Sequence, residues 1–212
     1  MRLLSVNLGM PAFLRGAKTP SPTGIDKKPA TSPITITVEG LSGDAVCNAK
    51  YHGGPDQAVY IYGAPDYAWW EDQLGHPIAP GTFGDNLTVT GWESSSAIVG
   101  DRFHIGPVTL EITSPRIPCS TLSRHMEDSA FVKKFRIAER PGVYCRVLRE
   151  GAVQADDEVT YEPYSGSDVV SIMELYHDAF SPVKDTETLR RHLAAPISIR
   201  LRKAKEKLFA KL

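Results

Sequence analysis

The chain has 212 residues, of which 42% are apolar, and its 24 Lys and Arg against 25 Asp and Glu give a formal net charge of -1. This length suits one good-sized domain with a small appendage, and the balanced charge argues against a nucleic-acid binder that relies on bulk positive charge. No apolar run approaches the roughly 18 residues of a membrane span, and the three cysteines are too few for a disulfide scaffold. Residues 1–14 are interrupted by Gly9 and Pro11 and lack the apolar centre of a secretory signal, so we expect a soluble protein of the cytoplasm.

Before Gly166, short segments rich in β-branched and aromatic residues alternate with glycine and proline. This alternation is typical of half-buried strands separated by turns. The predicted strands cover residues 34–38, 58–62, 87–89, 102–105, 108–113, 143–148 and 158–161, and helices are predicted near 65–74 and 129–138. Many short strands with few crossover helices predict a mainly β fold, namely a closed or nearly closed β-barrel with a few peripheral helices over residues 1–165.

Residues 166–212 have a different texture and predict a small C-terminal domain of three short helices. Ser171 and Glu174 fit a capping box, in which each side chain serves a free backbone amide of the other residue. Asp185 can cap a second helix, and a third helix begins near Ser198. Helices this short do not fold alone, so we expect them to pack on the barrel or on a partner.

The third predicted helix is amphipathic and basic. Its apolar face is predicted to carry Leu201, Ala204, Leu208 and Leu212. The rest of its surface is predicted to be covered by Arg200, Arg202, Lys203, Lys205 and Lys207. This basic surface is a candidate docking site for a partner protein, and an ordinary solvated helix face explains it equally well.

Cys119 is the strongest single candidate for chemistry. It ends the segment PRIPC at 115–119, where two prolines fix the backbone and Arg116 can favour the thiolate over the thiol. A thiolate at this position would be a nucleophile or a soft-metal ligand. From the residues alone, the alternative that Cys119 is a buried, inert cysteine in a turn has about even odds. Cys145 alternates within a predicted strand and is expected in the core, and Cys47 belongs to no motif.

Three loops carry weaker signals. His52-Gly-Gly54 allows a close backbone approach to a ligand, Asn86 follows a glycine-rich turn, and Lys27 lies in a loop before Pro29. By itself each loop also fits an ordinary turn or a solvated lysine. The cysteines and the six histidines show no conventional zinc-ligand spacing, so a metal bound at Cys119 would arrive with most of its ligands already supplied.

Together and in this order, these segments resemble the MOSC family, which is named for the C-terminal domain of molybdenum-cofactor sulfurases. The helical tail resembles the extension of its YiiM-like subgroup, the hydroxylaminopurine-resistance proteins. The family often has Glu where Asp85 stands, a change that we expect to alter a loop contact without removing the site. The matching segments are residues 24–29, 40–44, 52–54 with 58–60, 83–87, 99–101 and 115–119.

The resemblance implies a MOSC-type β-barrel and a molybdenum cofactor (molybdopterin), with Cys119 as the metal ligand and catalytic residue. A protein thiolate suits a metal centre whose other ligands are dithiolene sulfurs and oxo groups. The resemblance further implies that the cofactor's anionic and polar groups are bound by Lys27, His52, Gly53, Asn86, Arg116 and Arg146, of which Arg146 is the weakest assignment. Pyridoxal phosphate binding is not expected.

The function implied is reduction of N-hydroxylated compounds, such as hydroxylaminopurine-type bases and amidoximes. The sequence has no flavin, iron–sulfur or nicotinamide motif, so electrons are expected from a separate reductase. Neither nucleic acid nor membrane is an expected partner, and a homodimer is left open. The alternative is a non-catalytic carrier module for molybdenum cofactor or sulfur, and a purely structural β-barrel is the least favoured interpretation.

Overall fold

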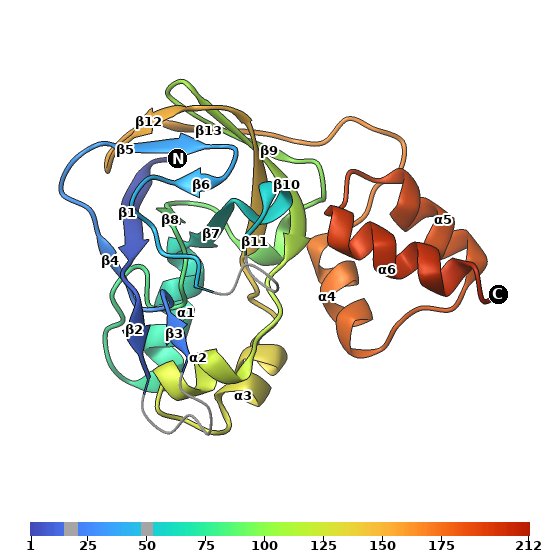
Figure 1. Cartoon of the computed structure of the whole chain (residues 1–212), viewed down its shortest axis with the longest axis horizontal. Helices are drawn as coiled ribbons and strands as arrows, with labels where there is room; N and C mark the ends of the chain where they lie inside the picture. Colours follow the sequence, from blue (N-terminus) through green and yellow to red (C-terminus); the bar gives the residue numbers. More distant parts are fainter. Residues whose placement is uncertain (15–20, 48–52) are drawn as a thin grey trace.

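The computed structural model describes residues 1–14, 21–47 and 53–212, so the predicted site residue His52 lies outside the described residues. Its largest feature is an eight-stranded sheet in the order β13-β9-β10-β11-β7-β8-β1-β4 (Figure 1). Neighbouring strands are antiparallel except β7 and β8, which are parallel. These strands are β1 (Leu3–Gly9), β4 (Lys27–Pro29), β7 (Val59–Gly63), β8 (Leu87–Val89), β9 (Arg102–Ile105), β10 (Val108–Pro115), β11 (Val143–Arg149) and β13 (Val159–Glu162).

Two smaller sheets complete the β structure of the described residues. One joins β12, β5 and β6, and the other joins β2 and β3. Their strands are β2 (Ala12–Phe13), β3 (Pro22–Thr23), β5 (Ile34–Thr37), β6 (Gly40–Leu41) and β12 (Gly151–Val153). The prediction is confirmed in that β-sheets dominate the architecture, and they are accompanied by several helices.

The closed barrel is not confirmed. No strand pairing joins the end strands β4 and β13 in the part of the chain that the structure describes. The large sheet nevertheless curls, because the Leu3 amide donates to the Asp157 carbonyl at 2.9 Å and the Val159 amide donates to the Met1 carbonyl at 3.0 Å. The start of β1 therefore lies beside the start of β13 without a continuous ladder.

Strand β7 separates two hydrophobic cores. Its residues Val59 and Ile61 pack into the interior of the large sheet, whereas Tyr60 and Tyr62 face an aromatic cluster. The helices α1 (Ala64–Leu74) and α3 (Phe131–Ala138) close that cluster, and the Trp70 ring stacks at 5.1 Å from the ring of Phe131 on α3. Both helices were predicted from the sequence. The short helix α2 (Ser120–His125) was not, and neither were the 3-10 turns η1 (Pro55–Gln57) and η2 (Ser94–Ser96).

Three helices follow the sheet, as predicted, and stand together to one side of the strands in Figure 1: α4 (Ile172–Phe180), α5 (Thr186–Ala194) and α6 (Ile199–Phe209). Ser171 accepts the Glu174 amide at 3.0 Å, and Asp185 accepts the Thr188 amide at 2.7 Å, so the predicted caps of α4 and α5 are present. Ser198 caps α6 in the same way. The other half of the predicted capping box is wrong, because the Glu174 carboxylate binds Arg191 and His192 on α5 instead of the Ser171 amide.

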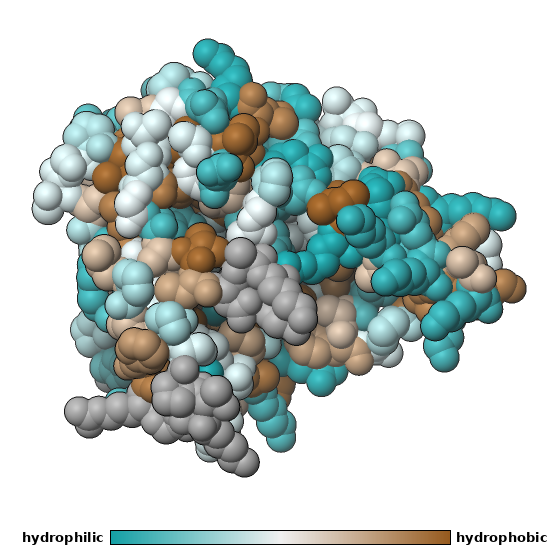
Figure 2. All heavy atoms as spheres, in the orientation of Figure 1, coloured by the Kyte–Doolittle hydropathy of each residue, from teal (hydrophilic) through white to brown (hydrophobic). Residues whose placement is uncertain are grey.

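The faces predicted for the third helix are wrong at three positions, of which the first is Ala204, expected on the apolar face but exposed. Lys205, expected on the solvated face, is 4% exposed because its Nζ donates to Asp178 on α4 at 2.7 Å. Conversely, Leu212 is 62% exposed although it was expected on the apolar face. The side of the C-terminal helices that Figure 2 shows is nevertheless largely hydrophilic.

The C-terminal helices share the core of the sheet. Ile172 and Leu175 of α4, together with Ala195 and Ile197 before α6, belong to the same buried cluster as the strands. The division into domains at residue 166 stays a prediction. None of the helices in the described ranges is both long enough and apolar enough to cross a membrane.

Candidate functional site

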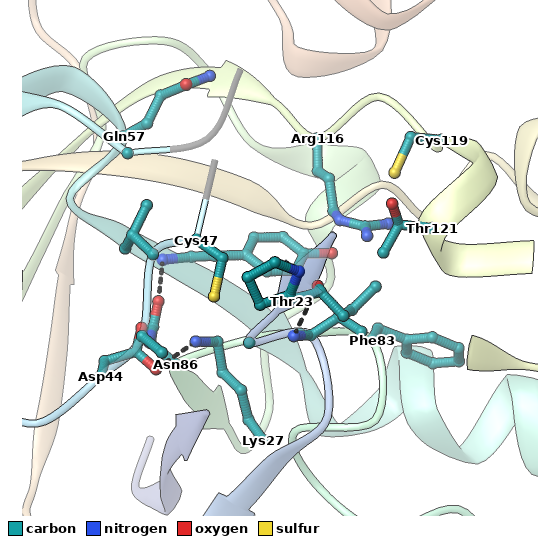
Figure 3. Close-up of a pocket in the computed structure, with 18 of the residues that line it drawn as sticks. Thr23, Lys27, Asp44, Cys47, Gln57, Phe83, Asn86, Arg116, Cys119 and Thr121 are labelled. Atoms are coloured by element: carbon teal, nitrogen blue, oxygen red, sulfur yellow. Dashed lines mark hydrogen bonds and ion pairs between the residues drawn. The ribbon is translucent and has the colours of Figure 1, made fainter. Parts of the chain in front are cut away.

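A cavity of about 980 Å³, part of it open to solvent, lies where α2 begins and the loop before β7 ends. The predicted site residues that line it are Lys27, Gly53, Asn86, Arg116 and Cys119. In Figure 3, Arg116, Cys119 and Thr121 lie on one side of the pocket, and Lys27, Asp44 and Asn86 lie on the other.

Arg116 is a buried cation that the protein does not fully satisfy. It is 4% exposed, and its Nη1 atom has no hydrogen-bond partner among the described residues. Its guanidinium lies 5.5 Å from the Tyr60 ring centre and 5.6 Å from that of Phe135. Burial acts to lower the pKa of Arg116, but Tyr60 and Tyr144 outweigh this effect and raise the pKa, so the side chain stays charged. The pocket therefore holds a donor suited to an anionic or carbonyl-bearing ligand.

Cys119 stands immediately before α2, where β10 has ended and the two prolines of the PRIPC segment fix the path of the chain. Its side chain is partly exposed, and its sulfur is one of the groups whose charge acts on Arg116. Cys145 is 0% exposed on β11, as predicted for a core residue. Of the two, only Cys119 is thus accessible to a ligand in the pocket.

Lys27 on β4 is held by protein contacts. Its Nζ forms a short ion pair with Asp44, and the side chain is 7% exposed. Asp44 also accepts the Gly9 amide at 2.7 Å and the Asn86 Nδ2 at 2.9 Å. The Asn86 Oδ1 accepts the Tyr60 amide at 3.1 Å, so both ends of this side-chain amide contact protein. The charge of Lys27 is therefore balanced locally, whereas that of Arg116 is not.

Asp85 directly precedes the pocket residue Asn86 and is 0% exposed. Its carboxylate accepts Tyr67 Oη at 2.6 Å, Thr88 Oγ1 at 2.7 Å and Asn7 Nδ2 at 3.3 Å. Burial raises the pKa of Asp85, and the hydrogen bonds from Tyr67 and Thr88 act in the opposite direction. These donors fix the carboxylate of Asp85, which is one methylene shorter than the Glu often found in the family. Asp85 in turn orders the loop that carries Asn86.

Most residues that line the pocket were not predicted as site residues, and three of them carry reactive or unpartnered groups. Cys47 lines the pocket near Lys27 and is exposed (Figure 3). Gln57 and Arg124 also line it, and the Gln57 Oε1 and Arg124 Nε atoms are buried with no partner in the described ranges. Arg124 follows Cys119 by little more than one helical turn of α2, and this spacing is the one signal that could have pointed to it.

Arg146 does not line the cavity. Its Nε donates to Asp56 Oδ1 at 2.9 Å, and its Nη1 donates to Glu111 Oε1 at 3.2 Å. Its Nη2 donates to the carbonyls of Pro196 and Ile197, at 3.1 Å and 3.2 Å. The structure thus brings five predicted site residues together and places Arg146 between the sheet and the C-terminal helices.

The described residues contain no group of three or more His, Cys, Asp or Glu side chains close enough to hold a metal ion. The donor set fits a prosthetic group that carries its own metal ligands. Cys119 offers one soft ligand, and the unpartnered Nη1 of Arg116 offers a donor for an anionic group of the same molecule.

Comparisons with known proteins identify the family of the chain. Residues 48–160 match the family model of the MOSC domain. The chain is 36% identical over 180 residues to YflK of Bacillus subtilis (84% of this chain, 81% of the relative). It is 31% identical over 139 residues to YiiM of Escherichia coli (64% of this chain, 62% of the relative).

A protein named "Reductase" from Gibberella moniliformis is 27% identical over 158 residues, which make up 71% of this chain but 28% of that protein. Among solved structures, YiiM from Geobacillus stearothermophilus superposes with a TM-score of 0.79 at 23% identity and covers 98% of both chains. This structural similarity supports the fold alone.

Proposed function

The chain belongs to the MOSC domain family, and from this premise we propose that it is a molybdenum-cofactor-dependent oxidoreductase that reduces N-hydroxylated compounds. The substrate class comprises hydroxylaminopurine-type bases and amidoximes. The electrons come from a separate reductase, because the sequence carries no flavin, iron–sulfur or nicotinamide motif of its own.

One observation carries the proposal. An accessible thiol, Cys119, and a buried cation with a free donor atom, Arg116, line the same cavity. A thiol in a cavity also suits a nucleophilic enzyme, but such an enzyme needs a base that activates the sulfur. The cation beside Cys119 in the pocket, Arg116, stays protonated and cannot act as that base, and we therefore assign the thiol the role of a metal ligand.

We propose that Cys119 binds the molybdenum and that Arg116 binds an anionic group of the cofactor. Lys27 contributes from the opposite wall, where Asp44 holds it, and Asn86 keeps that ion pair in place. The glycine at Gly53 lets the backbone come close to the cofactor. When bound, the cofactor supplies the two-electron chemistry that removes oxygen from nitrogen. The protein supplies orientation, charge balance and a partly enclosed site.

The reaction balances as R–NHOH plus two electrons and two protons giving R–NH₂ and water. The name of the fungal relative supports a redox role for the shared region, which is a small part of that protein. The sequence similarity to YiiM of Escherichia coli supports the placement in the same subgroup.

The test is to express the full chain in cells with an intact molybdenum-cofactor pathway. Molybdenum content is then measured together with the reduction of a hydroxylaminopurine by an artificial electron donor. Metal with turnover supports the proposal. Metal without turnover would instead favour a carrier of molybdenum cofactor or sulfur, and the absence of both would defeat the two hypotheses.

A further inference from the structure

Asp56 links the wall of the pocket to the C-terminal helices. Its Oδ1 atom accepts Arg146 Nε at 2.9 Å, and its Oδ2 atom accepts the backbone amide of Ile199 at 2.6 Å. Ile199 is the first residue of α6, where the helix dipole favours a negative charge. On the other side, Asp56 is followed directly by Gln57 and Ala58, which both line the cavity. The Asp56 carboxylate thus connects the pocket wall to β11 through Arg146 and to the first residue of α6 through the Ile199 amide.

The backbone of this wall is also fixed. Thr113 Oγ1 on β10 donates to the Asp56 carbonyl at 2.6 Å, and the Gln57 amide closes a turn onto the Gly54 carbonyl at 2.9 Å. Gly53 has φ 92°, and a Cβ atom there would lie 2.8 Å from the Cγ1 atom of Val46, another residue of the cavity. A shift of Asp56 would therefore move pocket-lining groups.

Arg146 forms the other half of the connection. Its Nη2 holds the carbonyls of Pro196 and Ile197, in the link between α5 and α6. The next amide, that of Ser198, donates to the Thr113 carbonyl at 3.1 Å. The link is therefore fastened to the same strand, β10, that fixes the Asp56 backbone.

The junction also brings positive charge toward the pocket. Arg200 on α6, next to Ile199, is close enough to act on Tyr144, which lines the cavity. Burial raises the pKa of Tyr144, and the charges of Arg116 and Arg200 both act against this rise. The C-terminal helices are therefore electrostatically coupled to the site as well as attached near it.

We propose that Asp56 and Arg146 are positioning residues through which the C-terminal helices fix the pocket wall at residues 53–58. The proposal rests on the proposed function only in treating the cavity as a ligand site. A wall made of a double glycine and one 3-10 turn has little rigidity of its own, and a precise site needs support from groups around it.

The test uses the full-length protein without cofactor, so that it does not depend on molybdenum. The rates at which iodoacetamide alkylates Cys119 and Cys145 are measured by peptide mass spectrometry, well below the melting temperature. Because Cys145 is 0% exposed, its rate reports opening of the whole fold. We expect Asp56→Asn to raise the Cys119 rate by roughly threefold or more through local opening, with the Cys145 rate unchanged.

The matched control is Asp178→Asn. Asp178 is a carboxylate of similar burial, with 12% of its side chain exposed against 19% for Asp56, and it pairs with Lys205 inside the helical unit. We expect Asp178→Asn to leave the Cys119 rate unchanged. If Asp56→Asn does not fold, Arg146→Gln replaces it, because that variant keeps the contact between Asp56 and Ile199.

Three results would overturn the proposal. The first is an alkylation rate of Cys119 in Asp56→Asn that equals the wild-type rate. The second is an equal rise of the Cys119 rate in Asp178→Asn. The third is a rise of the Cys145 rate in Asp56→Asn in parallel with that of Cys119. Where turnover is measurable, loosening the wall should raise KM more than it lowers kcat. Failure of the chain to take up molybdenum would leave the alkylation result intact, so the two hypotheses can fail separately.

Discussion

Three side chains of the pocket bury polar atoms that have no hydrogen-bond partner among the described residues. In the C-terminal helices, by contrast, most of the buried polar atoms have a hydrogen-bond or ion-pair partner. In the pocket these atoms are Gln57 Oε1, Arg116 Nη1 and Arg124 Nε. Leaving a buried polar group without a partner costs about 1–3 kcal/mol. A fold tolerates this cost where a ligand supplies the missing partners.

In the C-terminal helices, Lys205 pairs with Asp178, and Glu174 binds both Arg191 and His192. The exception among their described residues is the Nδ1 atom of His192. Pairing of this kind fixes how helices pack, because breaking one pair leaves the other charge buried. This difference supports the proposal that the pocket binds a ligand, whereas the charges of the helical unit serve its packing, and four changes test it.

The largest effect is expected from Cys119→Ser. If the thiolate is the molybdenum ligand, exchanging sulfur for oxygen should lower turnover roughly 100-fold or more and release metal, with the fold intact. The measurements are turnover, molybdenum content and circular dichroism. Cys145→Ser is the control and should act through packing alone. Full activity of Cys119→Ser would refute the ligand assignment, as would selective loss of metal from Cys145→Ser.

Breaking a pair in the helices should be the next largest effect. Lys205→Met leaves the Asp178 carboxylate buried without its partner, and we expect a loss of about 3 kcal/mol in the free energy of unfolding. Denaturant unfolding measures this loss. The control is Lys203→Met on the exposed side of the same helix. If the two variants are equally stable, the buried pair contributes nothing to folding.

Arg116→Met also removes a buried cation, but in the pocket, and should lower cofactor affinity more than it lowers the free energy of unfolding. It removes a donor aimed at the ligand, so cofactor affinity should fall about 10- to 100-fold, the range of one charge-assisted hydrogen bond. Its effect on unfolding should be smaller than that of Lys205→Met, because the Nη1 atom has no protein partner among the described residues to lose. A stability loss as large as that of Lys205→Met, with cofactor retained, would make Arg116 a structural residue.

The smallest effect is expected from mild acidification. Burial lowers the pKa of His192 below 6.5, although the hydrogen bond to Glu174 acts to raise it. Because the unfolded chain takes up this proton first, stability is full above pH about 6.5 and falls as the pH decreases toward the folded-state pKa. Hydrogen exchange in α5 at pH 7 and 5.5 should show this loss, and His192→Gln should reduce it. If the loss of stability in α5 at the lower pH is as large in His192→Gln as in the wild type, groups other than His192 cause that loss.

Local patterns predicted most of the longer strands, including the fully buried β7 and β10, but missed β1 and the shortest strands. Strand β9 is found where apolar and polar residues alternate at residues 102–105, with the same bounds. Strand β1 was missed because its sequence, LLSVNLG, places two leucines side by side and ends in glycine, so that no strict alternation marks it. Helix α2 has six residues, too few for a periodic signal.

The candidate site could be predicted only in part, for a different reason. The residue types at Lys27, Asn86, Arg116 and Cys119 mark the pocket through the family resemblance. Which of them has a spare donor depends on partners distant in the chain, such as Asp44 for Lys27. The contact of Arg146 with Asp56 spans 90 positions, and no short-range rule distinguishes it from contact with a ligand. Lys205 was misplaced for the same reason, since its partner lies on another helix.

Strand β7 lies between the interior of the sheet and the aromatic cluster, with all five of its residues buried. Neither core can open without exposing one face of this strand, so both should melt in a single transition that includes the ligand-binding end. The backbone amides of β7 should consequently be among the slowest in the protein to exchange with deuterium, and their exchange rate would report global unfolding.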